Sequence, residues 1–216
     1  MRPQYFTMIY SDKQLQIIGA AEKLFAYNGF EGTSVRDIAE QAGVNVAMIS
    51  YYFGSKEKLL QALFEQRTKN LTVKIEGLLK DDTLTPFRKL EIVIDDYVER
   101  VAEKQRFYKL MICEQMLDKN RTVTGLLKEL KKKNSDLIVK LIEDGQRKKA
   151  FRKNIDVVLL MNTLFGVVMH SFLNQDFYKY YHELEEMTEE EFYELLKNKL
   201  NKYIKDLFKA TLSYEG

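Results

Sequence analysis

Apolar residues recur every three to four positions along most of the chain, and this spacing predicts amphipathic helices rather than strands. Ser11 with Gln14 forms a capping box that opens the first predicted helix, which ends at Gly29. Two shorter helices are predicted within 33–43 and 45–52. The pattern therefore predicts three short helices near the N-terminus, followed by longer ones.

Longer helices are predicted beyond position 80. Thr85 followed by Pro86 is typical of a helix start, and Thr188 opens the last predicted helix with another capping box. Only two prolines and ten glycines occur in 216 residues, which favours long uninterrupted helices. We therefore expect an all-α protein, with a three-helix domain in residues 1–55 and a larger helical domain in residues 56–216.

Composition excludes several classes of protein. The 34 basic and 32 acidic residues give a net charge of +2, so the chain as a whole is not polybasic. Its single cysteine, Cys113, excludes an internal disulfide framework and fits a reducing compartment. The N-terminus lacks the apolar core of a signal peptide, and the most apolar run, 157–173, is interrupted by polar residues. We expect a cytoplasmic protein with no membrane segment.

Two basic runs, at 128–133 and 147–153, stand out within this balanced composition. Either run could form a second nucleic-acid surface. Acidic residues interrupt or flank both, and such runs are more typical of the solvated face of a helix. We interpret them in that way.

The segment from Val35 to Tyr52 has the spacing of a helix-turn-helix. Ala39 provides the small side chain that is needed where two helices cross closely, and Gly43 provides the positive φ that the turn requires. The wedge between the helices would be filled by Ala42, Val44 and Ile49. An ordinary helical hairpin is the alternative, but it leaves the aromatic end and the charged segment that follow unexplained.

Three short runs carry a family resemblance: GTSVRDIA from Gly32, AGV from Ala42 and YYFGSKEKL from Tyr51. Together they resemble the N-terminal DNA-binding region of TetR/AcrR-type transcriptional regulators, over about residues 11–63. The rest of the chain is similar to that family only in being helical and of suitable length. The resemblance implies a dimeric repressor that binds a double-stranded DNA operator and releases it when a small molecule binds the C-terminal domain.

The third predicted helix is expected to place its first residues against base edges in the major groove, where Asn45 can also cap the helix. The tyrosines at its other end can donate to phosphate, while Phe53 is expected to turn inward. Lys56 is expected to bind phosphate beside the exposed N–H groups of the next helix. The recognition helix carries no charge, so its electrostatic contribution should be modest. The predicted DNA contacts are Thr33, Ser34, Arg36, Asn45, Val46, Ala47, Ser50, Tyr51, Tyr52 and Lys56.

The resemblance also implies an effector cavity among the central helices of the larger domain. Methionine-rich walls adapt to varied apolar shapes, so we expect a mainly hydrophobic effector of unknown identity. The candidate lining residues, which could also be ordinary core, are Phe107, Tyr108, Met111, Met116, Met161, Phe165, Met169 and His170. The alternative is that this domain binds a protein partner and no small molecule.

Catalytic chemistry has little support in the sequence. Two histidines and one cysteine leave no pairing of a nucleophile with a base, so we expect neither an enzyme nor a cofactor. His182, Glu183 and Glu186 lie within one helical turn, but a metal site usually needs a better-formed ligand set.

The last long helices are expected to form a homodimer interface. Both present wider apolar faces than one core requires, and a pair from each of two chains would build a four-helix interface. The alternative is that both helices serve only their own core. The predicted interface residues are Gly166, Phe192, Leu196, Leu200, Tyr203, Leu207 and Phe208.

Overall fold

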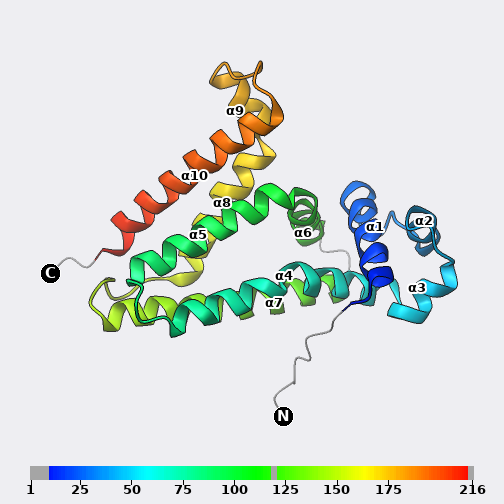
Figure 1. Cartoon of the computed structure of the whole chain (residues 1–216), viewed down its shortest axis with the longest axis horizontal. Coiled ribbons are helices and arrows are strands. Elements are labelled where there is room, and N and C mark those ends of the chain that lie inside the picture. Colours follow the sequence, from blue (N-terminus) through cyan, green and yellow to red (C-terminus); the bar gives the residue numbers. More distant parts are fainter. Residues whose placement is uncertain (1–9, 118–120, 214–216) are drawn as a thin grey trace, which may run out of the picture. The chain divides into compact units, whose positions relative to one another are not determined.

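The computed structural model describes residues 10–117 and 121–213, and its regular elements are helices (Figure 1). They are α1 (Asp12–Asn28), α2 (Val35–Gln41), α3 (Val46–Phe53), α4 (Lys56–Lys80), α5 (Pro86–Glu103), α6 (Gln105–Leu117), α7 (Arg121–Arg147), α8 (Val157–Leu173), α9 (Gln175–Tyr181) and α10 (Glu189–Leu212). The predicted all-α fold class is confirmed. Residues 1–9, which enter the expectation about a signal peptide, lie outside the described part.

The chain divides into two compact units, and the division does not follow the sequence order. The first unit combines Met1–Lys69 with Lys109–Leu127, and the second combines Asn70–Tyr108 with Lys128–Gly216. The expected boundary after residue 55 therefore falls inside the first unit. The division also runs through α6, so its first residues belong to the second unit and its last residues to the first.

The first unit is built on helix starts and turns that the sequence indicates locally. Ser11 and Gln14 form the predicted capping box at the start of α1. Ser34 forms another with Asp37 at the start of α2. Gly43 has φ 59°, as the predicted turn between α2 and α3 requires. The apolar faces of these helices meet in a core that contains Ile17, Ile18, Phe25, Ile38, Ile49, Leu59 and Leu63.

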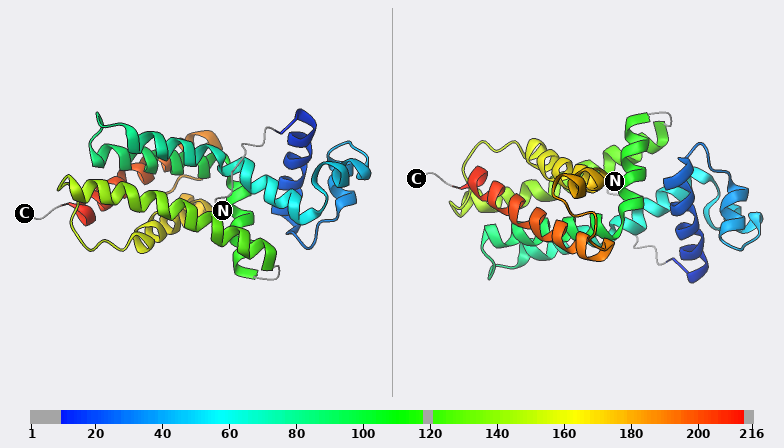
Figure 2. Two further views of the ribbon diagram at one scale, coloured as in Figure 1. Left: turned by 90° about the horizontal axis from the view of Figure 1, so that it is seen from below. Right: turned by 90° about the horizontal axis from the view of Figure 1, so that it is seen from above.

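The second unit is organised around α5, which packs along α10 and also contacts α8 (Figure 2). Ion pairs flank the contact between α5 and α10, from Lys197 to Glu99 and from Lys205 to Asp95. At the C-terminal end of α10, the N–H of Arg152 donates to the carbonyl of Leu212 at 2.9 Å, which ties the α7–α8 turn to this helix. The unit thus holds α10 along its length.

This packing corrects four of the seven residues predicted for the dimer interface. Four of its residues, Phe192, Leu196, Leu200 and Phe208, are at most 6% exposed within their own chain. They lie on the α10 face that is buried against the unit's own helices, so they could meet a partner only if α10 were unpacked. Of the other expected residues, Gly166 and Tyr203 are exposed and Leu207 is half-buried.

The apolar helix α8 is less buried than the sequence suggests. Leu160, Leu164, Val168 and Phe172 face the core. On the other side, several large side chains and Gly166 remain exposed, and they include Val158 at 60%, Leu159 at 64% and Leu173 at 51%. Within the described residues, no single helix is long and apolar enough to cross a membrane, and α8 meets that test only together with α9, across a 73° bend.

Candidate nucleic-acid interface and effector region

The short helix α3 has one buried and one exposed face. Ile49 and Phe53 are buried and fix the helix to the first unit, which confirms that Phe53 turns inward. The residues on the other face are Asn45, Val46, Ala47, Ser50 and Tyr51, and all of them are exposed. This exposed face includes the first residues of the helix, and a recognition helix in the major groove contacts bases with its N-terminal residues.

Asn45 has the capping role that its position predicts. Its Oδ1 accepts the N–H of Ala47 at 2.9 Å, and its backbone is extended, as at a helix N-cap. The side-chain Nδ2 can still donate to an acceptor outside the protein. Asn45 can therefore cap α3 and face a base edge at the same time.

The aromatic end of α3 is a row of edge-to-face ring contacts that runs from the surface into the core. Tyr51 is 83% exposed, and its ring lies edge-on to that of Tyr52, with centroids 5.2 Å apart. Tyr52 is half-buried and contacts the Phe53 ring in turn. Packing restrains the rings while the hydroxyl of Tyr51 remains accessible, which suits a contact to phosphate oxygen.

At the start of α2, the structure separates the three expected contacts. Ser34 and Arg36 are exposed, although the Ser34 hydroxyl also caps the helix. Hydrogen bonds from the backbone and then the hydroxyl of Ser34 hold the pKa of Asp37 below its usual value. Thr33 is only 1% exposed, and its hydroxyl donates to the carbonyl of Gly29 at 2.9 Å. Its side chain is therefore not on the surface, contrary to the expectation.

Lys56 also departs from its expected role. Its ammonium donates to the carbonyls of Phe30 at 2.9 Å and Thr33 at 3.0 Å, and it lies 4.3 Å from the centroid of the Phe30 ring. Lys58, two residues later, is exposed on the same turn of α4. Residues two apart point to different sides of a helix, so these two lysines face different surroundings.

An aromatic cluster in the second unit brings together three of the expected effector residues with one that was missed. Tyr97 of α5 lies 5.8 Å from Tyr108 and 4.9 Å from Phe165, ring to ring, and Phe107 contacts Tyr108. Burial raises the pKa of Tyr97 well above its usual value, with a further increase from Tyr108, and burial also raises the pKa of Tyr108. Tyr97 continues the apolar stripe of α5, and that spacing could have indicated it.

The remaining expected effector residues differ in burial and belong to different units. Met111 and Met116 belong to the first unit, and Met116 is 81% exposed. His170 is exposed on α8, with one ring nitrogen 2.6 Å from the Asn174 amide. Met161 and Met169 are buried in the second unit. That the whole set lines one cavity stays a prediction.

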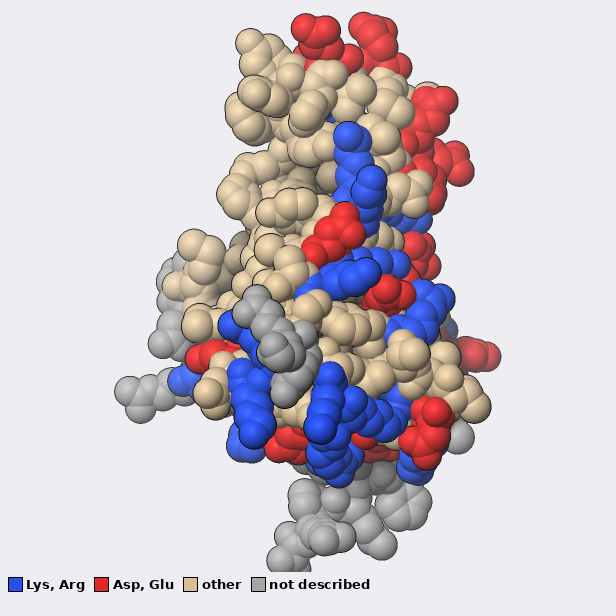
Figure 3. Space-filling view, turned by 90° about the vertical axis from the view of Figure 1, so that its left-hand side faces the viewer, with Lys and Arg blue, Asp and Glu red and all other residues tan. Residues whose placement is uncertain are grey.

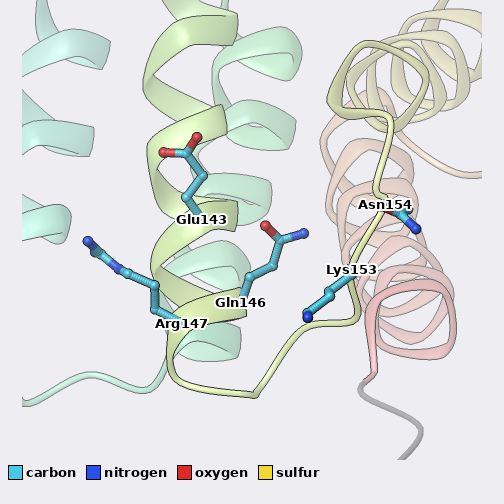
Figure 4. A pocket seen from close by; sticks show the side chains of 5 residues that line it. All are labelled: Glu143, Gln146, Arg147, Lys153 and Asn154. Atoms are coloured by element: carbon cyan, nitrogen blue, oxygen red, sulfur yellow. The ribbon is translucent and has the colours of Figure 1, made fainter.

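Two adjoining grooves lie elsewhere, at the α7–α8 turn. One, of about 560 Å³, is lined by Glu143, Gln146, Arg147, Lys153 and Asn154, and Figure 4 shows Gln146 and Lys153 facing one another across it. The other, of about 400 Å³, is lined by Val139, Ile142, Glu143, Gln146, Ile155, Asp156, Val157 and Val158. None of the expected effector residues lines either groove.

Charge is unevenly distributed around this turn. The exposed cations here are Arg147, Lys148, Lys149, Arg152 and Lys153. Figure 3, which views this end of the second unit, shows Lys and Arg crowded in its lower half with Asp and Glu among them, and Asp and Glu also at its top. Burial would raise the pKa of Asp144, but hydrogen bonds from Lys148 and Arg147 hold it below its usual value. Part of the basic run is thus neutralised locally.

A metal site finds no support in the described ranges, where no three His, Cys, Asp or Glu side chains gather as ligands would. The ring of His182 contacts the rings of Tyr178 and Tyr181, with centroids 4.4 and 5.1 Å away. These contacts give the His182 ring a packing role at the end of α9.

Comparison with known proteins extends over both units. Residues 17–63 match the model of bacterial regulatory proteins of the tetR family, and residues 86–197 match the tetracyclin repressor-like C-terminal domain. The chain is 28% identical to the fatty acid metabolism regulator protein of Bacillus subtilis over 158 residues, which are 72% of this chain and 79% of that protein. It is 32% identical to the probable HTH-type transcriptional regulator YttP of B. subtilis over 141 residues, 63% of this chain and 66% of that one.

Solved structures share the fold. FadR from Bacillus subtilis, in complex with stearoyl-CoA, superposes with a TM-score of 0.65 at 22% identity, over 88% of this chain and 96% of that one. A complex of SmeT with triclosan superposes with a TM-score of 0.74 at 20% identity, over 95% and 94% of the two chains. At these identities the likeness concerns the fold, which places the helix-turn-helix and the larger helical region in the same order.

Proposed function

Because this chain belongs to the TetR family of bacterial regulatory proteins, we propose that it acts as a dimeric repressor that leaves a palindromic operator when a small, mainly hydrophobic ligand binds. It is a DNA-binding transcriptional regulator rather than an enzyme. The observation that carries the proposal is the division of α3 into a buried face, with Ile49 and Phe53, and an outward face that begins at its N-terminus. That division is what a recognition helix needs.

Base reading is assigned to the outward face of α3. The Nδ2 of Asn45 can donate to an acceptor on a base, and the small apolar side chains of Val46 and Ala47 can contact a thymine methyl group. Contacts to the sugar-phosphate backbone would flank them, from Ser34, Arg36, Ser50, Tyr51, Tyr52 and Lys58. Residues 1–60 contain six basic and six acidic residues, so few ion pairs with phosphate are available and base contacts must supply much of the selectivity.

The dimer is assigned to the outward face of α8. Leu159 and Leu173 expose apolar side chains there, and Gly166 between them exposes backbone that a second helix can approach closely. Two copies related by a two-fold axis would cover this face on both chains. Two copies are also needed because one short helix contacts too few base pairs to be selective in a genome.

The effector is assigned to the second unit, at the aromatic cluster of Tyr97, Tyr108 and Phe165. Rings and buried hydroxyls together suit a ligand that is apolar along most of its length and has a polar group. Relatives of the same fold were solved with stearoyl-CoA and with triclosan, which supports a small ligand over a protein partner. The protein-partner alternative therefore has less support.

Selection of binding sites from random double-stranded DNA tests the proposal. The expected result is an inverted repeat with half-sites about 34–36 Å apart or a multiple of that spacing. Stearoyl-CoA, stearate, CoA and triclosan are then titrated into the complex. Stearoyl-CoA, stearate and triclosan, the three compounds with a large apolar part, are expected to release the DNA, and CoA is not. A chain that enriches no sequence would contradict the assignment to DNA, and release by none of the apolar compounds would contradict the proposed ligand class.

Asn45→Ala should reveal both roles of this residue. Loss of the cap is expected to lower the free energy of unfolding by about 1 kcal/mol. Loss of the Nδ2 donor should reduce discrimination at one position of each half-site by about 1–3 kcal/mol. Thermal unfolding and repeated site selection measure the two effects.

Asn45→Ser is the matched control, since serine keeps the cap but lacks the amide donor. It should restore stability while the relaxed position stays relaxed. If Asn45→Ser selects the same sequence as the parent at every position, Asn45 only caps the helix.

A further inference from the structure

The turn between α1 and α2 is held by two charged side chains that come from distant parts of the chain. Phe30, at its centre, is 1% exposed and follows Gly29, whose φ of 74° ends α1. The N–H of Phe30 donates to the carboxylate of Glu114 at 3.0 Å, across 84 positions of sequence. Its carbonyl accepts from the ammonium of Lys56 at 2.9 Å. One residue thus connects a buried anion and a cation.

Neither charged side chain is freely exposed to solvent. Glu114 is 5% exposed within the first unit, and Lys56 is half-buried. Burying a carboxylate is costly unless hydrogen bonds compensate, so a carboxylate placed against one backbone N–H must hold that N–H firmly. The Lys56 ammonium also binds the carbonyl of Thr33, which adjoins the N-cap of α2. The two side chains therefore hold both ends of this turn.

The turn sets where α2 begins, and α2 sets where α3 lies. Ser34 caps α2 directly after the turn, and α2 packs on both α1 and α3. A change in the turn would therefore shift the start of α2 and, with it, the exposed face of α3. We propose that Glu114 is a positioning residue for DNA binding, which acts through the N–H of Phe30 and touches no DNA. This inference rests on the proposed function.

Three variants of the full-length chain test the proposal. Glu114→Leu removes the acceptor, and Glu114→Gln keeps an oxygen at the same position. Glu22→Leu breaks the partly buried ion pair between Glu22 and Arg67 that joins α1 to α4. Glu22→Leu is the matched control because it weakens the same unit without touching the turn. The readouts are operator dissociation constants for the folded fraction and amide hydrogen exchange at Phe30, relative to the amide of Ile18.

Glu114→Leu should weaken operator binding at least tenfold and speed exchange at Phe30 at least tenfold relative to Ile18. Glu114→Gln should stay within about threefold of the parent in both, since the amide oxygen can accept the same hydrogen bond. Glu22→Leu should lower the melting temperature. It should leave the operator dissociation constant, and the exchange rate of Phe30 relative to Ile18, within about twofold of the parent. A parent-like dissociation constant for Glu114→Leu, or an equal loss in Glu22→Leu, would overturn the positioning role.

The exchange readout requires no DNA, so it separates two kinds of failure. A parent protein that selects no DNA sequence would refute the proposed function, whatever happens at Phe30. If the parent binds its operator and the Phe30 amide exchanges as slowly in Glu114→Leu as in the parent, only the inference about Glu114 is refuted.

Discussion

Leu159→Glu should convert the protein into a monomer that no longer holds its operator. Leu159 is 64% exposed on the outward face of α8, so the substitution costs the isolated chain little. In a dimer it would place two carboxylates in an apolar interface, where burying unpaired charge is strongly unfavourable. Loss of the second half-site should weaken operator binding by a factor of about 100 or more. Light scattering at micromolar concentration and an operator shift assay measure both effects.

Val73→Glu is the control for this substitution. Val73 lies on the α4 part of the second unit and is 67% exposed, so its substitution matches that of Leu159 in exposure and in the charge it introduces. It should remain dimeric and bind as the parent does. If Leu159→Glu also remains a dimer, the interface lies on another surface, and a monomeric parent that still binds an intact operator tightly would refute the two-fold arrangement altogether.

Lys56→Met should destabilise the first unit and leave its contacts to DNA unchanged. It removes charge-assisted hydrogen bonds to the carbonyls of Phe30 and Thr33, together with the contact to the Phe30 ring. The expected loss in the free energy of unfolding is about 2–4 kcal/mol. The slope of log affinity against log salt should stay unchanged for the folded protein, because no phosphate contact is lost. Denaturant titration and a salt series of operator titrations measure the two quantities.

Lys58→Ala is the matched comparison, with the opposite expectation. Lys58 is exposed beside the end of α3, so its loss should leave stability within about 0.5 kcal/mol of the parent. It should reduce the magnitude of the salt slope by about one unit per half-site. The reverse pattern, in which Lys56→Met lowers the slope and leaves stability unchanged, would restore the phosphate contact that the sequence predicted for Lys56.

The sequence alone was sufficient to predict the helix caps and turns that depend only on residues close together in the chain. The capping boxes at Ser11 and Thr188, the left-handed turn at Gly43 and the cap at Asn45 are decided by hydrogen bonds and backbone sterics within a few positions. The same local chemistry produces the helix-turn-helix pattern, which is why the family and the face of α3 could be predicted before the structure.

Tertiary packing decided the direction of side chains whose alternatives are equal in the sequence. An apolar stripe on α10 suits a partner subunit as well as a core, and only the packing against α5 buried Phe192 and Leu200 within the chain. Lys56 could face phosphate or carbonyl oxygen, and the choice depended on the carbonyls of Phe30 and Thr33 lying within reach. Glu114 carries no local signal at all, because its partner is 84 residues away and becomes visible only after folding.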